Sequence, residues 1–467
     1  MDGYFSCMSN LQDLYAFDLG HQRLNRRAAL IIQATLEHAG ESIPTAAGSR
    51  AATDATYRFL DNVNVLPNDL NEGHHRYTRD LSAQTSGPLL VIQDTTPADF
   101  TSPGRNHTLG QLAHAKHFGF FIHSALAVTE GGLPLGLLHQ HVWMRPPEER
   151  GQRAARRQKE TADKESQRWL DTEQAVVATL PADREVVTIS DREADFYDYF
   201  ALPRRPHQHV LVRAKPRRRL AGTKELLGVA VRAAPLRGTL TIQVPRRDDH
   251  HARTATLSVR FGTFALRPPS THLRRKDLPP LPLQAVLVEE EHPPAGVKPL
   301  CWLLLTTLPV ASLEDAARLV RWYSYRWRIE RYHFVLKSGC RLEELHLGTA
   351  ERWRRALALY AIVAARLLHL TYRGRQEPEA SCEPAVEREE WEVLWRQFQP
   401  GQALPAQPPR LRQVLRWIAQ LGGFLGRKGD GEPGVKVLWR GLRKLHAMVL
   451  GFRLARTTDP GVQSSDE

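Results

Sequence analysis

The chain has 467 residues, of which 42% are hydrophobic and 25% are charged. This balance is typical of a soluble globular protein and excludes a disordered chain, a collagen and a membrane bundle, and the length predicts two to four domains. Lys and Arg number 64 against 51 Asp and Glu, a net charge of +13, which favours a polyanionic partner, nucleic acid first.

The first 75 residues are predicted to be helical. Residues 24–40 repeat apolar side chains at helical spacing up to Gly40, and residues 52–62 form a second helical stretch. Arg50 and Arg58 would lie on the outer face of this bundle. The residues alone leave two interpretations open, a small DNA-binding domain that uses residues such as Arg58, or a solvated helical cap on a larger domain.

Two buried strands are predicted in the middle of the chain, and each ends in an aspartate. Residues 87–94 are an apolar run that ends at Asp94, and residues 185–191 are a similar run that ends at Asp191. Between them, residues 118–144 predict a β-hairpin around Gly131 and Gly132. Open α/β sheets place ligands at the carboxyl ends of their strands, so both aspartates are candidate site residues.

The other segments predict a mixed α/β protein with a β-rich insertion. Strands are expected at residues 209–215 and 299–309, a β-rich region at 216–300, and helices at 148–174, 312–339 and 410–456, with a polar linker at 377–409. Ser312 and Asp315 predict a capping box for the helix at 312–339, which would stop at Gly339. We expect domains at residues 1–75, 76–375 and 376–467.

A polar stripe marks the predicted helix at residues 312–339. In one continuous helix, Tyr323, Arg326, Glu330 and Lys337 would lie within about 60° of arc. One interpretation is a surface ion-pair ladder, since Arg326 and Glu330 are four residues apart and such a pair contributes roughly a few tenths of a kcal/mol. The rest of the helix is apolar enough to be buried, which favours a stripe that faces a functional site.

Together, the candidate acids predict a site for a divalent cation. Asp94, Asp191 and Glu330 offer only oxygen ligands, the kind that Mg²⁺ and Mn²⁺ prefer. Two such ions about 4 Å apart can activate water and stabilise the leaving oxygen of a phosphoryl displacement. The basic surface would hold the phosphodiester, and since the chain contains no Gly-x-x-x-x-Gly-Lys loop, no nucleotide cofactor is expected.

These residues resemble a known family. The pattern Tyr323, Arg326, Glu330 and Lys337 is similar to the YREK signature of DDE transposases of bacterial insertion sequences, in insertion-sequence family four, which includes the Tn-five transposase. The segments VIQDTT and DREAD, which contain Asp94 and Asp191, resemble the surroundings of the family's first two acids, and KESQRWL and WLLLTTLPV are also family-like. The resemblance covers nearly the whole chain.

The resemblance implies an RNase-H-like catalytic core with a β-rich insertion, between a helical DNA-binding domain and a helical C-terminal domain expected to dimerise. It implies that Asp94, Asp191 and Glu330 are catalytic and bind two Mg²⁺, for which Mn²⁺ can substitute, with Asp94 between both ions. The implied activity is cut-and-paste transposition at terminal inverted repeats, performed on transposon and target DNA by a homodimer in a synaptic complex.

The resemblance also implies a set of DNA contacts. Tyr323, Arg326 and Lys337 would hold a phosphate near the cleaved end. Trp302 would receive a base flipped out of a DNA hairpin by stacking, although its place in a predicted strand also suits a core residue. Arg213 and Lys215 would contact the transposon end, or belong to a solvated charge run.

Two alternative functions stay open on the sequence. The chain could be a catalytically silent protein that binds transposon ends, or a related RNase-H-like nuclease that cuts without joining. The histidine pairs at 74–75, 114 and 117, 139 and 141, and 250–251 lack an obvious third ligand, so no metal is expected there, and His74 and His75 are predicted to lie at the surface.

Thiols and terminal segments indicate a cellular location. Four cysteines lie far apart and form no Cys-x-x-Cys pair: Cys7, Cys301, Cys340 and Cys382. The sequence therefore predicts neither a disulfide framework nor a zinc knuckle, and suits a reducing cytoplasm. No signal peptide is visible, and the longest apolar stretch, residues 356–370, is too short to span a bilayer and predicts a buried helix. We expect a cytoplasmic, nucleoid-associated protein without a membrane partner.

Overall fold

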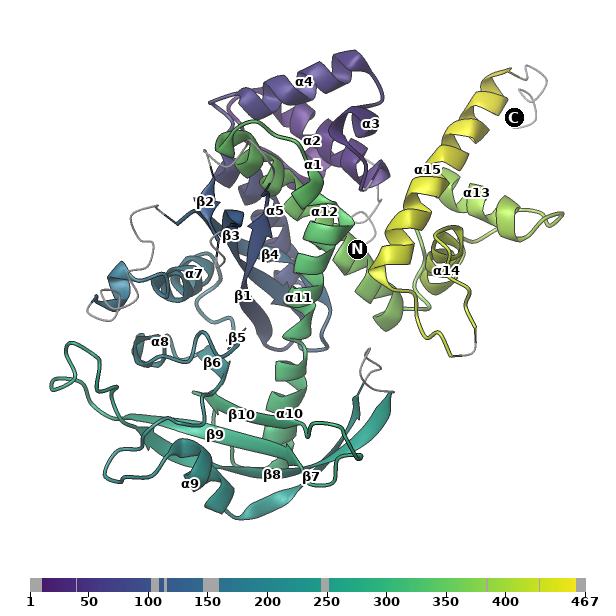
Figure 1. Cartoon of the computed structure of the whole chain (residues 1–467). Coiled ribbons are helices and arrows are strands. Elements are labelled where there is room, and N and C mark those ends of the chain that lie inside the picture. The colour runs from purple at the N-terminus through teal and green to yellow at the C-terminus, as the bar shows by residue number, and fades with distance from the viewer. Residues whose placement is uncertain are drawn as a thin grey trace.

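The computed structural model describes residues 11–38, 40–101, 109–112, 116–145, 159–244, 252–383, 385–427 and 429–458. Its centre is a ten-stranded mixed sheet with the strand order β2-β3-β1-β5-β6-β10-β9-β8-β7, in which β4 pairs with β3. Helices from both ends of the chain cover one part of this sheet, and the antiparallel extension lies at the other end (Figure 1). The predicted mixed α/β fold is confirmed.

The first half of the sheet has the strand arrangement of an RNase-H-like core. β1 (Leu89–Asp99) pairs antiparallel with β3 (Phe118–Val128), which pairs antiparallel with β4 (Pro134–Trp143). On its other side β1 runs parallel to β5 (Val186–Ser190), which runs parallel to β6 (Gln208–Arg213). The first five residues of β1 and all of β5 are buried, as the apolar runs predicted.

The β-rich segment extends this sheet instead of forming a separate layer. β10 (Cys301–Thr306) pairs with β6, and β9 (Leu281–Glu290), β8 (Arg253–Leu266) and β7 (Leu236–Val244) follow in antiparallel order. The short remaining elements of this part of the chain are β2 (Gly110–Gln111), η3 (Thr161–Asp163), α7 (Gln167–Ala178), α8 (Tyr197–Ala201) and α9 (Leu227–Ala233). Of the helix predicted at residues 148–174, the part up to residue 158 lies outside the described residues. Residues 159–166 contain only the short turn η3, so the α-helix begins at Gln167 and the predicted start was wrong.

The N-terminal region contains more helices than the two predicted stretches. They are α1 (Leu11–Tyr15), α2 (Gln22–Glu37), α3 (Ile43–Ala47), α4 (Arg50–Asp61) and α5 (Pro67–Ala83). The prediction missed the short α3 and started α4 two residues late, because the side chain of Ser49 accepts a hydrogen bond from the N–H of Ala52 and caps the helix at Arg50. Arg58 is exposed on α4.

A long buried helix joins the N-terminal helices to the sheet. α12 (Ala350–Gln376) packs against β4, α5 and α2, and it contains the predicted buried helix at residues 356–370. In the part of the chain that the structure describes, no helix combines the length and apolar character needed to cross a bilayer. His74 and His75, predicted to lie at the surface, are buried on α5 near this helix, so that prediction was wrong.

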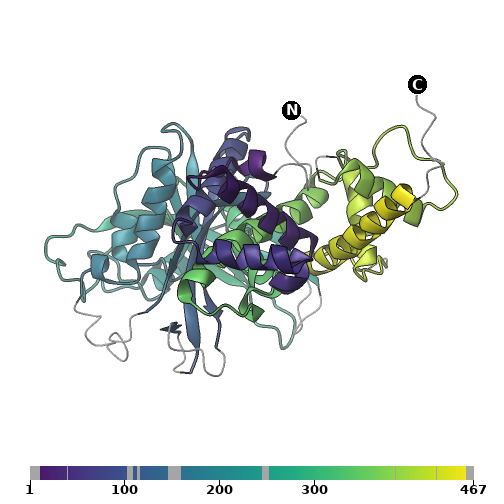
Figure 2. The same ribbon diagram turned by 90° about the horizontal axis from the view of Figure 1, so that it is seen from above.

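The C-terminal helices stand to one side of the sheet (Figures 1 and 2). α13 (Arg388–Phe398), α14 (Leu411–Leu421) and α15 (Val435–Thr458) pack on one another. The segment predicted to be a polar linker therefore contains α13, which begins with a capping box formed by Glu387 and Glu390. The charged residues of this segment resemble a linker, but α13 is an amphipathic helix that buries Trp391 and Leu394.

Candidate active site

Strand pairing places two of the predicted acids side by side. β1 and β5 are parallel, and their pairing runs from Leu89 and Val186 to Ile92 and Ile189. Asp94 and Asp191 each follow two residues beyond this last pair. Because parallel strands lie about 4.8 Å apart, the two carboxyl groups meet at the same edge of the sheet.

The third predicted acid reaches this edge from a helix that is not continuous. The predicted helix at 312–339 consists of α10 (Leu313–Ser324), α11 (Trp327–Phe334) and a π-helical turn, η4 (Val335–Gly339). The predicted capping box of Ser312 and Asp315 is present. The assumption of one continuous helix was wrong, since the N–H groups of Tyr325 and Arg326 bond to carbonyls only three residues back.

Arg326 ties the helix to the first strand. Its Nη1 lies 3.5 Å from Oδ2 of Asp94, and its Nη2 forms an ion pair with Glu330, one turn along the helix. The Arg326 residue is only 8% exposed, so this guanidinium is a buried cation between two of the three acids. The pair of Arg326 and Glu330 is therefore not the surface ladder that the sequence left open.

Burial and the nearby negative charges change the acidity of the site. Burial, followed by the negative charge of Asp191, raises the pKa of Asp94 to about 7, against the opposing effects of Arg326 and of the Thr95 N–H. Glu330 adds a smaller contribution of the same sign as Asp191. A carboxyl group that resists ionisation beside two others is typical of a site that binds a cation through these oxygens.

The donor set fits hard divalent ions. Asp94, Asp191 and Glu330 supply carboxylate oxygens, and neither His nor Cys is among them. Oδ1 of Asp191 accepts the N–H of Glu193 at 2.7 Å, and Oδ1 of Asp94 accepts the N–H of Thr95 at 2.8 Å. These backbone donors orient one oxygen of each carboxylate, and Mg²⁺ or Mn²⁺ is suited to such ligands.

A polar network that the sequence did not predict begins at Thr95, next to Asp94 on β1. Oγ1 of Thr95 lies 2.8 Å from Nδ1 of His123 and accepts a hydrogen bond of 3.0 Å from Nε of Arg168, which also pairs with Glu193. His123 is fully buried and packs edge-on against Trp169. Arg168 and Trp169 lie in the family-like segment KESQRWL. Arg168 reaches the site through Thr95 and Glu193, and Trp169 reaches it through His123, which the antiparallel pairing of β1 and β3 places beside Thr95.

Two aromatic residues adjoin the acids. Tyr323 is 3% exposed at the end of α10, and Trp302 lies on β10 with its ring edge-on to that of Tyr323 at 5.4 Å between centroids. Burial raises the pKa of Tyr323, and the charges of Arg326, Arg213 and Asp191 also act on it. Trp302 is only partly buried, so its position is compatible both with packing and with stacking on a base.

Three of the other predicted DNA-binding residues lie near this edge of the sheet, and Arg58 lies elsewhere. The Nζ of Lys337 donates to the carbonyl of Pro97 at 2.9 Å, just beyond Asp94 on β1. Arg213 donates to the carbonyl of Cys301 at 3.3 Å, and Nζ of Lys215 donates to the carbonyl of Asp195 at 3.2 Å. Arg58, on α4 in the N-terminal region, belongs to a different part of the fold.

Asp195 is a structural residue despite its closeness to Asp191 in the sequence. It is buried, accepts two hydrogen bonds from the guanidinium of Arg218 at 2.6 and 2.8 Å, and accepts the N–H of Lys215 at 2.6 Å. These contacts occupy both oxygens of its carboxylate and fix the segment that follows β6. Asp195 is therefore not available to complete the group of Asp94, Asp191 and Glu330.

Comparison with protein families divides the chain into three parts. Residues 11–65 match the family described as transposase DNA-binding, residues 146–366 match the transposase DDE domain, and residues 362–461 match the transposase Tn5 dimerisation domain. The DDE match includes Asp191 and Glu330 and begins after Asp94. The assignment of Asp94 to the same site therefore depends on the strand register and on its contact with Arg326.

Proposed function

Because this chain is a DNA transposase with a DNA-binding, a DDE and a dimerisation domain, we propose that it excises an insertion sequence at terminal inverted repeats and joins the freed 3′ ends to target DNA. The observation that supports this proposal best is the grouping of the three acids at one edge of the sheet, where Asp94 and Asp191 follow neighbouring strands and Arg326 contacts both Asp94 and Glu330. We assign the enzyme to the YREK subgroup of insertion-sequence family four on Tyr323, Arg326, Glu330 and Lys337. We also propose the functional division 1–75, 76–375 and 376–467.

Divalent metal ions are the cofactors of DDE transposases, and we propose that Asp94, Asp191 and Glu330 hold Mg²⁺, with Mn²⁺ as a substitute. Bound there, the ions would supply an activated water and stabilise the leaving 3′ oxygen. Asp94 lies between Asp191 on one side and Arg326 with Glu330 on the other, so it is the residue best placed to serve both ions. The raised pKa of Asp94 means that this carboxyl group must lose a proton before it can act as a ligand.

The cationic side chains around the acids would position the DNA. Arg326 pairs with Asp94 and Glu330 here, and it would turn to a phosphate oxygen when these carboxylates bind cations. Lys337, Arg213 and Lys215 lie around the same edge and would contact the phosphates of the transposon end, while Arg58 would contact DNA from the N-terminal domain. Such contacts fix the register of the DNA without reading its sequence.

The dimerisation domain supports an assembly in which two chains act together. We propose a homodimer in a synaptic complex, in which each protomer acts on the transposon end that the other holds. The C-terminal helices α13 to α15 stand away from the sheet, where they can meet a second copy (Figure 2).

The proposed function is tested with DNA that carries the ends flanking this gene. We expect purified protein and Mg²⁺ to cut at the element boundary, and to yield a joined product when a target plasmid is added. Cleavage without joining would favour the related nuclease, and binding without cleavage would favour the silent end-binding protein. Either result would overturn the proposal.

Trp302 has a separable role in the proposed reaction. If its ring receives a flipped base, Trp302→Ala should slow the closing of a DNA hairpin on the transposon end by about tenfold or more, since stacking on an aromatic ring contributes about 1–3 kcal/mol per base. The first nick should be affected far less. The measurement is the accumulation of nicked and hairpin DNA on a denaturing gel.

Trp302→Phe is the matched control, because it retains an aromatic face in the same packing position. It should restore most of the hairpin formation. If Trp302→Ala slows the nick and the hairpin step equally, the residue is part of the core beside Tyr323 and does not bind a base.

A further inference from the structure

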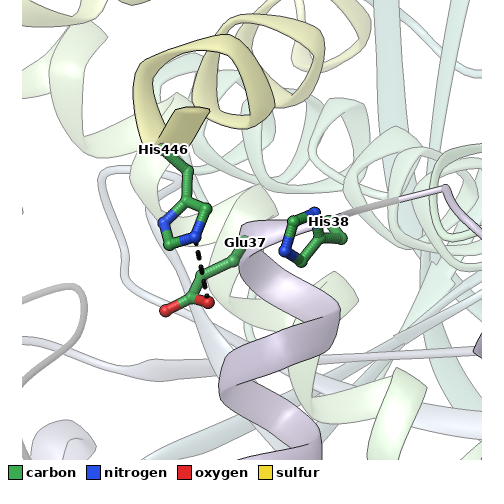
Figure 3. A group of neighbouring side chains, drawn as sticks. All are labelled: Glu37, His38 and His446. Atoms are coloured by element: carbon green, nitrogen blue, oxygen red, sulfur yellow. Dashed lines mark ion pairs between the residues drawn. The ribbon is translucent and has the colours of Figure 1, made fainter. Parts of the chain in front are cut away.

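A histidine and carboxylate cluster outside the active site joins helices from the N-terminal and C-terminal parts of the chain. Glu37 is the last residue of α2, His38 is its C-cap, and His446 lies on α15 (Figure 3). Each of the three offers a ligand atom that lies within 4.8 Å of the other two. Nε2 of His446 is 3.4 Å from Oε2 of Glu37, and the ring centroids of His38 and His446 are 5.2 Å apart.

The spacing and chemistry of this cluster suit a transition metal. Two imidazoles and one carboxylate, with a fourth position for water, form the ligand set of many zinc sites. With bonds of about 2.0–2.1 Å, the ligand atoms of a tetrahedral site lie roughly 3.3 Å apart, close to the observed separation of Glu37 and His446. Mg²⁺ prefers oxygen ligands, so the ion would differ from the one at the active site.

Neighbouring residues orient the Glu37 carboxylate and pair with the two arginines near the cluster. Oε1 of Glu37 accepts a hydrogen bond of 3.0 Å from Nε2 of Gln33, which leaves Oε2 directed at His446. Arg443 and Arg453 lie near the cluster, but each guanidinium is paired with another carboxylate, Glu41 and Glu389 respectively. The hydrogen bond from Gln33 has the role of the outer-shell contacts that hold metal ligands in place.

Space for a fourth ligand exists beside the cluster. Glu37 and His446 border a cavity of about 50 Å³ whose other walls include Leu36, Leu442 and the buried Glu390. A cavity volume of about 10–15 Å³ on this measure is enough for one water molecule, so the cavity can hold the solvent ligand of an open coordination position.

We propose that Glu37, His38 and His446 form a binding site for Zn²⁺ or a similar transition-metal ion, which fastens the C-terminal helix α15 to helix α2 of the DNA-binding domain. A metal ion bound at this cluster would link the two helices, and the link would be lost when the ion is released. Metal occupancy would then change how firmly the dimerisation domain is held against the domain that binds DNA. The competing explanation is a metal-free contact in which the carboxylate of Glu37 pairs with His446.

The test uses the untagged full-length protein, freed of metal with a chelator. Zn²⁺ is titrated against a chromophoric chelator in the presence of excess Mg²⁺, which keeps oxygen-only carboxylate sites occupied. We expect one tight Zn²⁺ site per chain, lost in His446→Ala and weakened at least tenfold in Glu37→Gln. His292→Ala, which removes an exposed histidine elsewhere, should leave the site unchanged.

Two further measurements separate ligand loss from misfolding. Co²⁺ should give the visible absorption of a four-coordinate site in the wild type and not in His446→Ala, and Zn²⁺ should raise the Tm of the wild type alone. His38→Asn changes a half-buried helix cap, so it should fold normally and weaken Zn²⁺ binding. It serves as the ligand variant if His446→Ala proves unstable. Absence of a tight site in the wild type, or equal binding by wild type, His446→Ala and His38→Asn, would overturn the proposal.

Discussion

Glu330→Gln is expected to reduce cleavage at the transposon end by about three orders of magnitude or more, while the affinity for uncut end DNA changes little. The substitution keeps the size of the side chain and removes the negative charge that would hold a metal ion. Metal ions contribute several kcal/mol of transition-state stabilisation in such reactions, and each 1.36 kcal/mol corresponds to about a tenfold change in rate. The measurement is single-turnover cleavage with Mg²⁺, alongside a binding titration on the same DNA.

The matched control for this substitution lies on the preceding helix. Glu314→Gln makes the same chemical change at an exposed position in the first turn of α10, and it should leave cleavage unchanged. Loss of DNA binding together with cleavage in Glu330→Gln would point to a structural defect, since Arg326 would lose its ion-pair partner. Full cleavage by Glu330→Gln would remove this residue from the active site.

The strand pattern of the sequence predicted that the first two acids each follow a buried strand, but it did not predict that these strands are neighbours. The apolar runs before Asp94 and Asp191 indicated buried strands, and parallel pairing with equal offsets follows from the structure. The helical periodicity was less informative for the third acid, because it assumed an unbroken helix. The tight turn at Tyr325 and Arg326 and the π-helical turn η4 depend on tertiary packing, and no local periodicity reports them.

Contacts between distant segments could not be predicted from the sequence. His123 supports Thr95 only because β1 and β3 pair in one register, and a register shift of one residue would turn it to the other face of the sheet. Glu37 and His446 are separated by most of the chain, and α15 must fold back on α2 before they meet. The helix α13 was missed for a different reason, since its first turn is rich in Glu and Arg, which resembles a polar linker.

Asp94→Asn is expected to stabilise the metal-free protein at pH 8 and to give little or no stabilisation near pH 4. The folded state raises the pKa of Asp94 from 3.8 to about 7, so between these values the folded protein holds a proton that the unfolded chain has released. Stability therefore falls as the pH rises through this range, by up to about 1.4 kcal/mol per pH unit. Over about three pH units the lost stability amounts to at most about 4 kcal/mol. The gain from Asp94→Asn at pH 8 is smaller than this, because the substitution also removes a charge partner of Arg326.

The test of this prediction combines pH with metal binding. Denaturant unfolding of wild type and Asp94→Asn in the presence of a chelator is measured at pH 4 and at pH 8. The control is Asp183→Asn, which changes an exposed aspartate before β5. If Asp94→Asn raises the unfolding free energy equally at both pH values, the charge of Asp94 is not the cause of the stabilisation. Mg²⁺ should then stabilise the wild type at pH 8 but stabilise Asp94→Asn much less, because ligand binding to the folded state adds stability only where the ligand atoms remain. A residue that destabilises the protein when ionised, and stabilises it when ionised with a cation present, has the energetic signature of a metal ligand and not of a structural acid such as Asp195.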